Sequence, residues 1–197
     1  VEARNASAIH LAELLKQLPG PMVSLLVTSR VQLGWPEETS LELGGLSKEE
    51  GAALFRQSAP QRSETIDLAQ QLSQLVDGHP LSLRLLGGAF NASAITLPAF
   101  LAEYEAQLVK AQNKYVSEHH RQRTLYASIE TSVRYLDEDH RHLLSSLWLF
   151  HAPFFPETAE EIFEPQAETA AEGKETEDQD SPIYDRLHTL WRRGLLL

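Results

Sequence analysis

The spacing of apolar residues along the chain predicts a mainly helical protein. Between residues 6 and 18, apolar side chains recur in the clusters typical of an amphipathic helix, and this segment stops at Pro19-Gly20-Pro21. Further apolar segments, bounded by proline, glycine or polar stretches, predict helices at 47–55, 66–76, 81–86, 97–108, 125–136, 137–150, 157–163 and 183–191, with Asp137 as the N-cap of the helix that follows it. Such helices bury one face against each other, so we expect helix-on-helix packing over most of the chain.

Two short runs at 22–27 and 40–43 depart from the helical pattern. The first is too continuously apolar for a half-exposed strand, and it predicts a strand covered on both faces, as in a parallel sheet. The second predicts its partner. Either the neighbouring strands are missing from this chain, or the two runs form a very small sheet with each other. In both cases we expect a residual α/β edge.

Thr28, Ser29 and Arg30 follow the first predicted strand directly. A parallel sheet binds its ligands just beyond the carboxyl ends of its strands, and an arginine there offers a planar, permanently charged fork suited to phosphate. The alternative is an arginine that pairs with a surface carboxylate. From these residues alone both interpretations stay open.

Gly78 and Pro80 mark a fixed corner between two predicted helices. We expect Gly78 to supply the positive φ that ends the first helix, and Pro80 to open the second, where its missing N–H costs nothing. A flat proline ring beside exposed backbone can line a pocket for a purine. The same spacing also serves as plain punctuation between helices.

The net charge of −11 is concentrated in one stretch of the 197 residues. Ten acidic residues and a single lysine lie between 157 and 180, so the rest of the chain carries only −2. Residues 165–181 contain too few large apolar side chains to offset the entropy of ordering, which predicts a disordered acidic insertion. The insertion is either simply solvated or a contact for a basic partner.

Several classes of protein lack their signals here. No window approaches a membrane span, no basic-then-apolar leader opens the chain, and there is no cysteine, so we expect a cytoplasmic protein without disulfides or thiolate metal sites. The histidines have no metal-binding helical spacing and no Gly-x-Ser-x-Gly elbow occurs. We therefore predict no metal ligand and no catalytic residue in this chain.

Taken in order, the motifs resemble the NB-ARC module of STAND-type signalling ATPases. The resemblance rests on Leu25-Leu26-Val27-Thr28-Ser29-Arg30, Leu41-Glu42-Leu43-Gly44-Gly45-Leu46, the capping box Ser47-Lys48-Glu49-Glu50, and Val76-Asp77-Gly78-His79-Pro80. It implies that 1–46 is the carboxyl edge of a P-loop α/β nucleotide-binding domain and that 47–111 is a helical bundle of the ARC1 type. It further implies a linker at 112–124 and a winged-helix-like domain at 125–197, with the acidic insertion 165–181 inside it.

The resemblance also implies a nucleotide-dependent switch in signal transduction that binds ADP or ATP with Mg²⁺. Arg30 matches the sensor of the terminal phosphate, with Thr28 and Ser29 beside it, and Gly78 and Pro80 match the motif that places proline beside adenine. In the family, the winged helix moves when the nucleotide changes. Activated members form homo-oligomers and respond to protein partners through sensor repeats.

The chain departs from the family in having no Gly-x-x-x-x-Gly-Lys-Ser/Thr loop and no apolar strand ending in an acidic pair. It looks like a fragment that follows an upstream P-loop segment of a slow P-loop ATPase. We expect this piece alone to bind no nucleotide tightly and to be inactive.

Two alternatives to the switch remain, a winged-helix DNA-binding regulator and a non-catalytic helical adaptor. DNA contact would use cations of the last helix such as Arg192, but the acidic insertion beside it would repel a duplex, so we do not expect a nucleic-acid partner.

Overall fold

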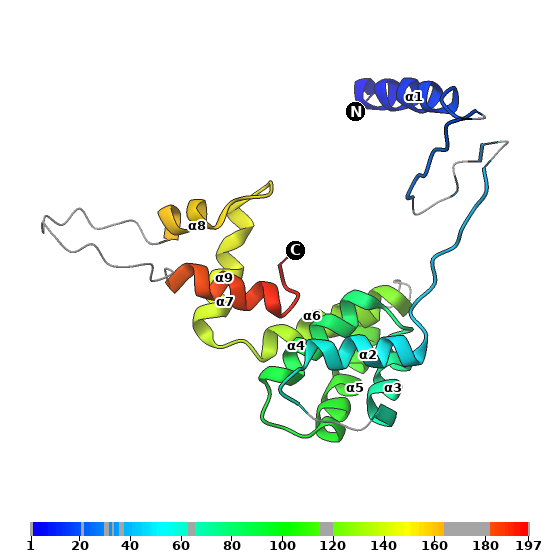
Figure 1. The fold of residues 1–197 in the computed structure, drawn as a ribbon. Coiled ribbons are helices and arrows are strands. Elements are labelled where there is room, and N and C mark those ends of the chain that lie inside the picture. The colour runs from blue at the N-terminus through cyan, green and yellow to red at the C-terminus, as the bar shows by residue number, and fades with distance from the viewer. Residues whose placement is uncertain are drawn as a thin grey trace, which may run out of the picture. The chain divides into compact units, whose positions relative to one another are not determined.

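The computed structural model describes residues 2–20, 22–29, 32, 34–35, 38–62, 66–114, 120–163 and 182–196. The prediction of a mainly helical protein is confirmed for these residues (Figure 1). The chain divides into two compact units, Val1–Leu43 and Gly44–Leu197. No helix within the described ranges is long and apolar enough to cross a membrane.

The first unit consists of α1 (Glu2–Lys16) and an extended segment. The prediction of strands at 22–27 and 40–43 is wrong, because neither run forms a strand in the structure. Among the described residues, the β-type pairing consists of an isolated antiparallel bridge between Gly20 and Val23. Met22 and Leu26 are 94% and 91% exposed. A strand meant for burial on both faces needs neighbours for its backbone hydrogen bonds, and the described residues offer none.

The second unit begins with a bundle of helices around one core. Its members are α2 (Lys48–Ser58), α3 (Ile66–Leu75), α4 (Pro80–Ala92), α5 (Leu97–Lys114) and α6 (His120–Arg134). The central helix is α4, which packs on α2 and α6 and buries nearly all its residues from Ser82 to Phe90. Phe90 contacts Phe55 and Phe100, with ring centroids 5.8 and 5.3 Å apart. This aromatic row ties helices from both ends of the bundle to α4.

A second core lies towards the carboxyl end of the same unit. It is built by α7 (Glu138–Ser146), the 3₁₀ turn η1 (Leu147–Leu149), α8 (Pro156–Phe163) and α9 (Pro182–Arg192). Its buried side chains are Leu136, Leu143, Leu147, Ala159, Ile183, Leu187 and Leu190. The predicted disordered insertion 165–181 lies outside the described residues.

The two cores meet at the end of α6. Ala127 of α6 belongs to the bundle core and Tyr135 packs against it, whereas Leu136 belongs to the second core. Helix α6 itself packs on α4 and α5. The change from one core to the other therefore takes place across a single peptide bond, between residues 135 and 136.

Candidate functional site

The corner between α3 and α4 is closed by local backbone hydrogen bonds. Gly78 N–H donates to Ser73 O at 2.8 Å and Asp77 N–H donates to Gln74 O at 3.1 Å, the pair of bonds that defines a Schellman motif. The sequence predicts positive φ at Gly78 alone. In the structure φ is 61° at Gly78 and 51° at Asp77, so both residues adopt it. Asp77 occupies the left-handed position of the motif, which aspartate tolerates because its short side chain bonds locally.

Pro80 starts α4 as the sequence predicts, and His79, to which the sequence assigned no role, caps the helix. Pro80 occupies the first turn of the helix, and His79 is the N-cap, with its Nδ1 accepting from the N–H of Ser82 at 3.2 Å. An imidazole can accept this bond only when that nitrogen carries no proton. Burial first, and then the Arg121 guanidinium, hold the pKa of His79 below its ordinary value. The cap is therefore a neutral histidine, and it leaves the Pro80 ring exposed beside it.

The segment before α2 docks onto this corner through backbone contacts. Leu46 N–H donates to Gly78 O at 2.9 Å. A Cβ atom at Gly45 would overlap the carbonyl oxygen of Asp77, and one at Gly78 would overlap the carbonyl oxygen of Leu46. The two glycines, 33 positions apart in the sequence, thus permit one close backbone crossing. The sequence alone suggested only that Gly45 ends a strand.

A cavity of about 350 Å³ adjoins the crossing. Its lining residues are Leu46, Lys48, Ser73, Gln74, Asp77 and Gly78. The Ser73 hydroxyl is fully buried and makes no hydrogen bond within the described part of the chain. Pro80 is not among the lining residues, so the cavity opens beside the corner and not against the proline ring.

The first residue of α6, His120, contacts the corner through its side chain. His120 Nδ1 lies 2.8 Å from Asp77 Oδ2, and both side chains are about half exposed. The sequence predicts residues 112–124 as a polar linker, and nothing in their pattern indicates that His120 reaches Asp77. We name Asp77–Pro80, Gly45, Leu46 and His120 together the elbow.

The remaining predicted site residues belong to the other unit. Thr28 and Ser29 are exposed in Val1–Leu43, and Arg30 lies outside the described residues. The structure brings Gly78 and Pro80 together at the elbow. That these two and Arg30 contact one nucleotide stays a prediction.

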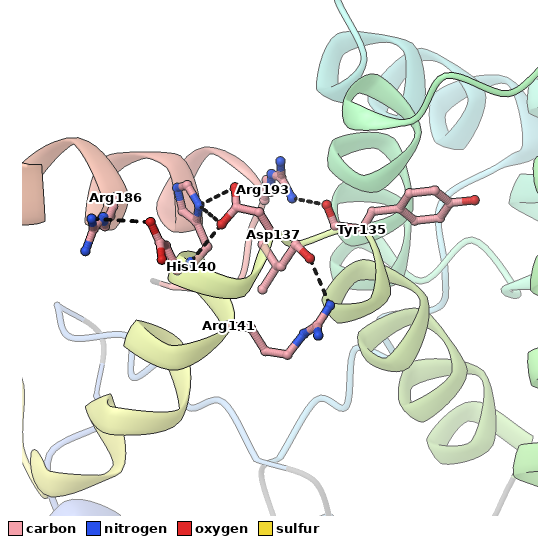
Figure 2. A network of polar contacts seen from close by, with 8 residues as sticks. Tyr135, Asp137, His140, Arg141, Arg186 and Arg193 are labelled. Atoms are coloured by element: carbon pink, nitrogen blue, oxygen red, sulfur yellow. Dashed lines mark hydrogen bonds and ion pairs between the residues drawn. The ribbon is translucent and has the colours of Figure 1, made fainter.

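A second polar cluster surrounds the peptide bond at which the two cores meet (Figure 2). Arg193 Nη1 donates to Tyr135 O at 2.8 Å, and Arg141 Nη2 donates to Leu136 O at 2.9 Å. Asp137 caps α7 by accepting from His140 N at 2.9 Å, and it also pairs with the His140 ring. These bonds lower the pKa of Asp137, the backbone bond most. We call residues 135–137 with their two arginines the joint.

Arg193 reaches the joint because of how α9 ends. Leu195 N–H donates to Leu190 O at 3.0 Å and Gly194 N–H donates to Trp191 O at 2.9 Å, with Gly194 at φ 75°. This second Schellman motif turns the chain against α4, where a Cβ at Gly88 would crowd the Arg193 backbone. Burial lowers the pKa of the Arg193 guanidinium, and the Asp137 carboxylate acts against that shift.

The described residues hold no cluster of three or more histidine or carboxylate side chains placed to bind a metal ion. Comparisons of the chain with models of protein families, with curated proteins and with solved structures found no match. The elbow and the joint are therefore the features of the chain that bear on its function.

Proposed function

We propose that this chain is part of an ADP/ATP-dependent signalling switch of the STAND type, in which it senses the bound nucleotide and couples it to a change in domain arrangement. The observation that carries the proposal is the elbow. Leu46 and Gly78 are bonded at 2.9 Å, so two of the motifs that resemble the NB-ARC module meet in space although they are distant in sequence.

The elbow suits a purine for chemical reasons. Pro80 presents an exposed, rigid ring, and its helix is fixed by a neutral His79 cap that adds no charge next to the ring. An apolar ring of this kind stacks on a flat base at little entropic cost, because proline has no side-chain freedom to lose. In the proposed complex Arg30, with Thr28 and Ser29, contacts the phosphates.

The joint suits the coupling part of the proposal. Residues 135–137 connect the bundle core to the second core along the chain. Two arginines there donate hydrogen bonds to consecutive carbonyl groups, those of Tyr135 and Leu136. The winged-helix-like domain is predicted at 125–197, but α6 packs on α4 and α5 of the bundle. We therefore propose that this domain of the switch starts at residue 136 and that it reorients about this link. A nucleotide shifts such an equilibrium only by its different affinities for the two states.

The P-loop and the Mg²⁺-binding groups are absent from the sequence of this chain, so we propose that an upstream P-loop segment supplies them. The isolated chain should then bind nucleotide weakly and hydrolyse none. A titration with fluorescent ADP tests this point directly. Sub-micromolar affinity of the 197-residue chain would show that the phosphates are held in some other way.

The test of the switch uses the protein together with its P-loop segment. Pro80→Ala should weaken the affinity for ADP and ATP alike by about 5- to 30-fold, as expected for the loss of one apolar contact. Arg30→Ala should reduce the preference between the two nucleotides, because only ATP has a γ-phosphate for it to contact. Pro98→Ala, in the first turn of α5, is the matched control and should change neither.

Unchanged nucleotide affinity in Pro80→Ala would leave the helical adaptor as the better interpretation. A salt-dependent shift of duplex DNA by the chain would favour the DNA-binding regulator instead. Two of the cations on or next to α9 already have partners in the structure, since Arg186 lies 3.5 Å from Asp139 and Arg193, just after the helix, is bonded to Tyr135 O.

A further inference from the structure

The second core carries an apolar groove that the proposed switch does not use. The groove has a volume of about 360 Å³ and lies between residues 152–156 and α9. The residues that shape its walls include Pro153, Phe154, Pro156, Tyr184, His188 and Trp191. Apolar hollows of this size on a surface mark places where another molecule binds.

One face of α9 forms the longer wall. Tyr184 and Trp191 lie two turns apart, and the His188 ring stacks on Trp191 with 5.6 Å between ring centroids. Trp191 remains 51% exposed. Because Ile183, Leu187 and Leu190 already fill the core from the same helix, the aromatic face is additional apolar surface left outside the core.

A protruding side chain stands directly beside the groove. Phe155 is 78% exposed, while its sequence neighbours Phe154 and Pro156 both line the hollow. Phe154 stacks on Phe150 with ring centroids 4.0 Å apart, which fixes the backbone from which Phe155 projects. A rigid apolar knob and an apolar hollow of suitable size therefore adjoin each other on one surface.

Charge is arranged in the same paired way. Helix α8 begins at the groove and exposes Glu157 and Glu161, whereas α9 exposes Asp185 in its first turn and Arg192 in its last turn. A partner must therefore present a basic edge to α8 and an acidic group to the last turn of α9. A second copy of this chain, turned about a two-fold axis, presents both without any further requirement.

We infer that the chain forms a two-fold symmetric dimer in which Phe155 of each copy enters the groove of the other. The contact is isologous, so each knob and each hollow is used once and no open surface is left to propagate. The acidic stretch 164–181 of the same chain does not suit the groove, because its sequence contains no aromatic, leucine, isoleucine, valine or methionine residue. The inference needs no nucleotide and stands apart from the proposed switch.

Sedimentation velocity of the 197-residue chain, without nucleotide, tests the dimer at about 1 to 200 μM protein. Salt at about 0.15 M screens the long-range repulsion between two copies that each carry −11. Phe155→Ser should raise the dimer dissociation constant by about 10- to 30-fold, as for the loss of a central anchor residue. Val109→Ser, at another exposed apolar position, on α5 of the bundle, is the control and should leave the constant unchanged.

Exchanging charges separates this interface from unspecific association. Glu161→Lys alone and Arg192→Glu alone should each weaken the dimer, because like charges then face each other in both symmetric contacts. A mixture of the two variants should form heterodimers, in which both contacts are again between opposite charges. Circular dichroism of each variant should match that of the unchanged chain, since all the altered side chains are exposed.

Three results would overturn the inference. The first is a chain that stays monomeric up to the highest concentration. The second is a dimer that tolerates Phe155→Ser, which would place the contact elsewhere. The third is a monomer whose Trp191 fluorescence changes on addition of a proline-rich peptide, which would assign the groove to peptide binding through aromatic side chains.

Discussion

At the scale of single residues, the elbow depends on glycines, whose lack of a side chain lets two backbone segments come close together. Gly45 lies so close to Asp77 that a single Cβ atom would overlap the Asp77 carbonyl oxygen. The preceding residue, Gly44, has no atom within 4 Å of the position its Cβ would take. Two adjacent glycines that look alike in the sequence therefore differ in what they permit.

Gly45→Ala should lower the free energy of unfolding by about 1 to 3 kcal/mol, because the backbone crossing must open to admit the methyl group. Gly44→Ala should change it by less than about 0.5 kcal/mol. Urea unfolding followed by circular dichroism measures both. Equal effects of the two substitutions would contradict the close crossing at Gly45.

The His79 cap gives the elbow a dependence on pH. The pKa of His79 is lowered in the folded protein, so the unfolded chain binds the proton more readily. The stability contributed by the neutral cap is complete above the unfolded pKa of about 6.5 and is lost as the pH falls through it towards the folded value. The sign is thus destabilisation by acid.

Comparison with His79→Asn isolates this effect, because asparagine also caps helices but does not titrate. The urea midpoint of the unchanged chain should fall more steeply than that of the variant between about pH 7.5 and pH 5.5. The two proteins differ at no other residue. Parallel curves would mean that His79 is not held neutral.

At the scale of elements, the starts of helices were predictable from sequence and their partners were not. The Ser47–Glu50 capping box, the Asp137 cap and Pro80 at the start of α4 are all confirmed, since each depends on residues within one turn. Trp148 and Trp191 belong to the apolar pattern of two predicted helices, yet they are 71% and 51% exposed. Apolar spacing identifies a helix, but the extent of its buried face depends on which elements cover it.

The elbow and the joint show the same limit. Gly78 and Pro80 could be found by their local roles, whereas the approach of Leu46 to Gly78 and of Arg193 to Tyr135 joins residues 32 and 58 positions apart. The predicted strands at 22–27 and 40–43 failed for a related reason, because a strand is stable only beside other strands. Contacts between distant residues are therefore the part that sequence patterns leave open.

Loss of the Arg193 hydrogen bond at the joint should destabilise the second core more than the bundle. Arg193→Met keeps the apolar stem but removes the donor to Tyr135 O, so the half-buried carbonyl loses its partner at a cost of about 1 to 3 kcal/mol. Amide hydrogen exchange should become faster in α7 and α9 while α4 keeps its protection. Arg56→Met, at an exposed position in the last turn of α2, is the control and should leave exchange unchanged. Uniformly faster exchange in all helices would mean that the two cores unfold as one.

At the scale of the whole molecule, stability should come from one of the two units. Both hydrophobic cores are composed of residues from Leu46 onwards, and no described residue before Gly44 belongs to either. The apolar side chains of α1 remain exposed, among them Ile9, Leu11 and Leu14. Exposed apolar area contributes little to folding, because the hydrophobic effect acts only on surface removed from water.

A chain that starts at Gly44 should therefore fold as the full chain does. Its free energy of unfolding should differ by less than about 0.5 kcal/mol, the usual limit for changes outside a core, and its urea m-value should fall only slightly. Removal of three more residues, to start at Ser47, should cost about 1 to 3 kcal/mol, because Leu46 then no longer contacts Gly78 or the bundle core. A large loss of stability in the first truncation would contradict the expectation that the second unit folds by itself.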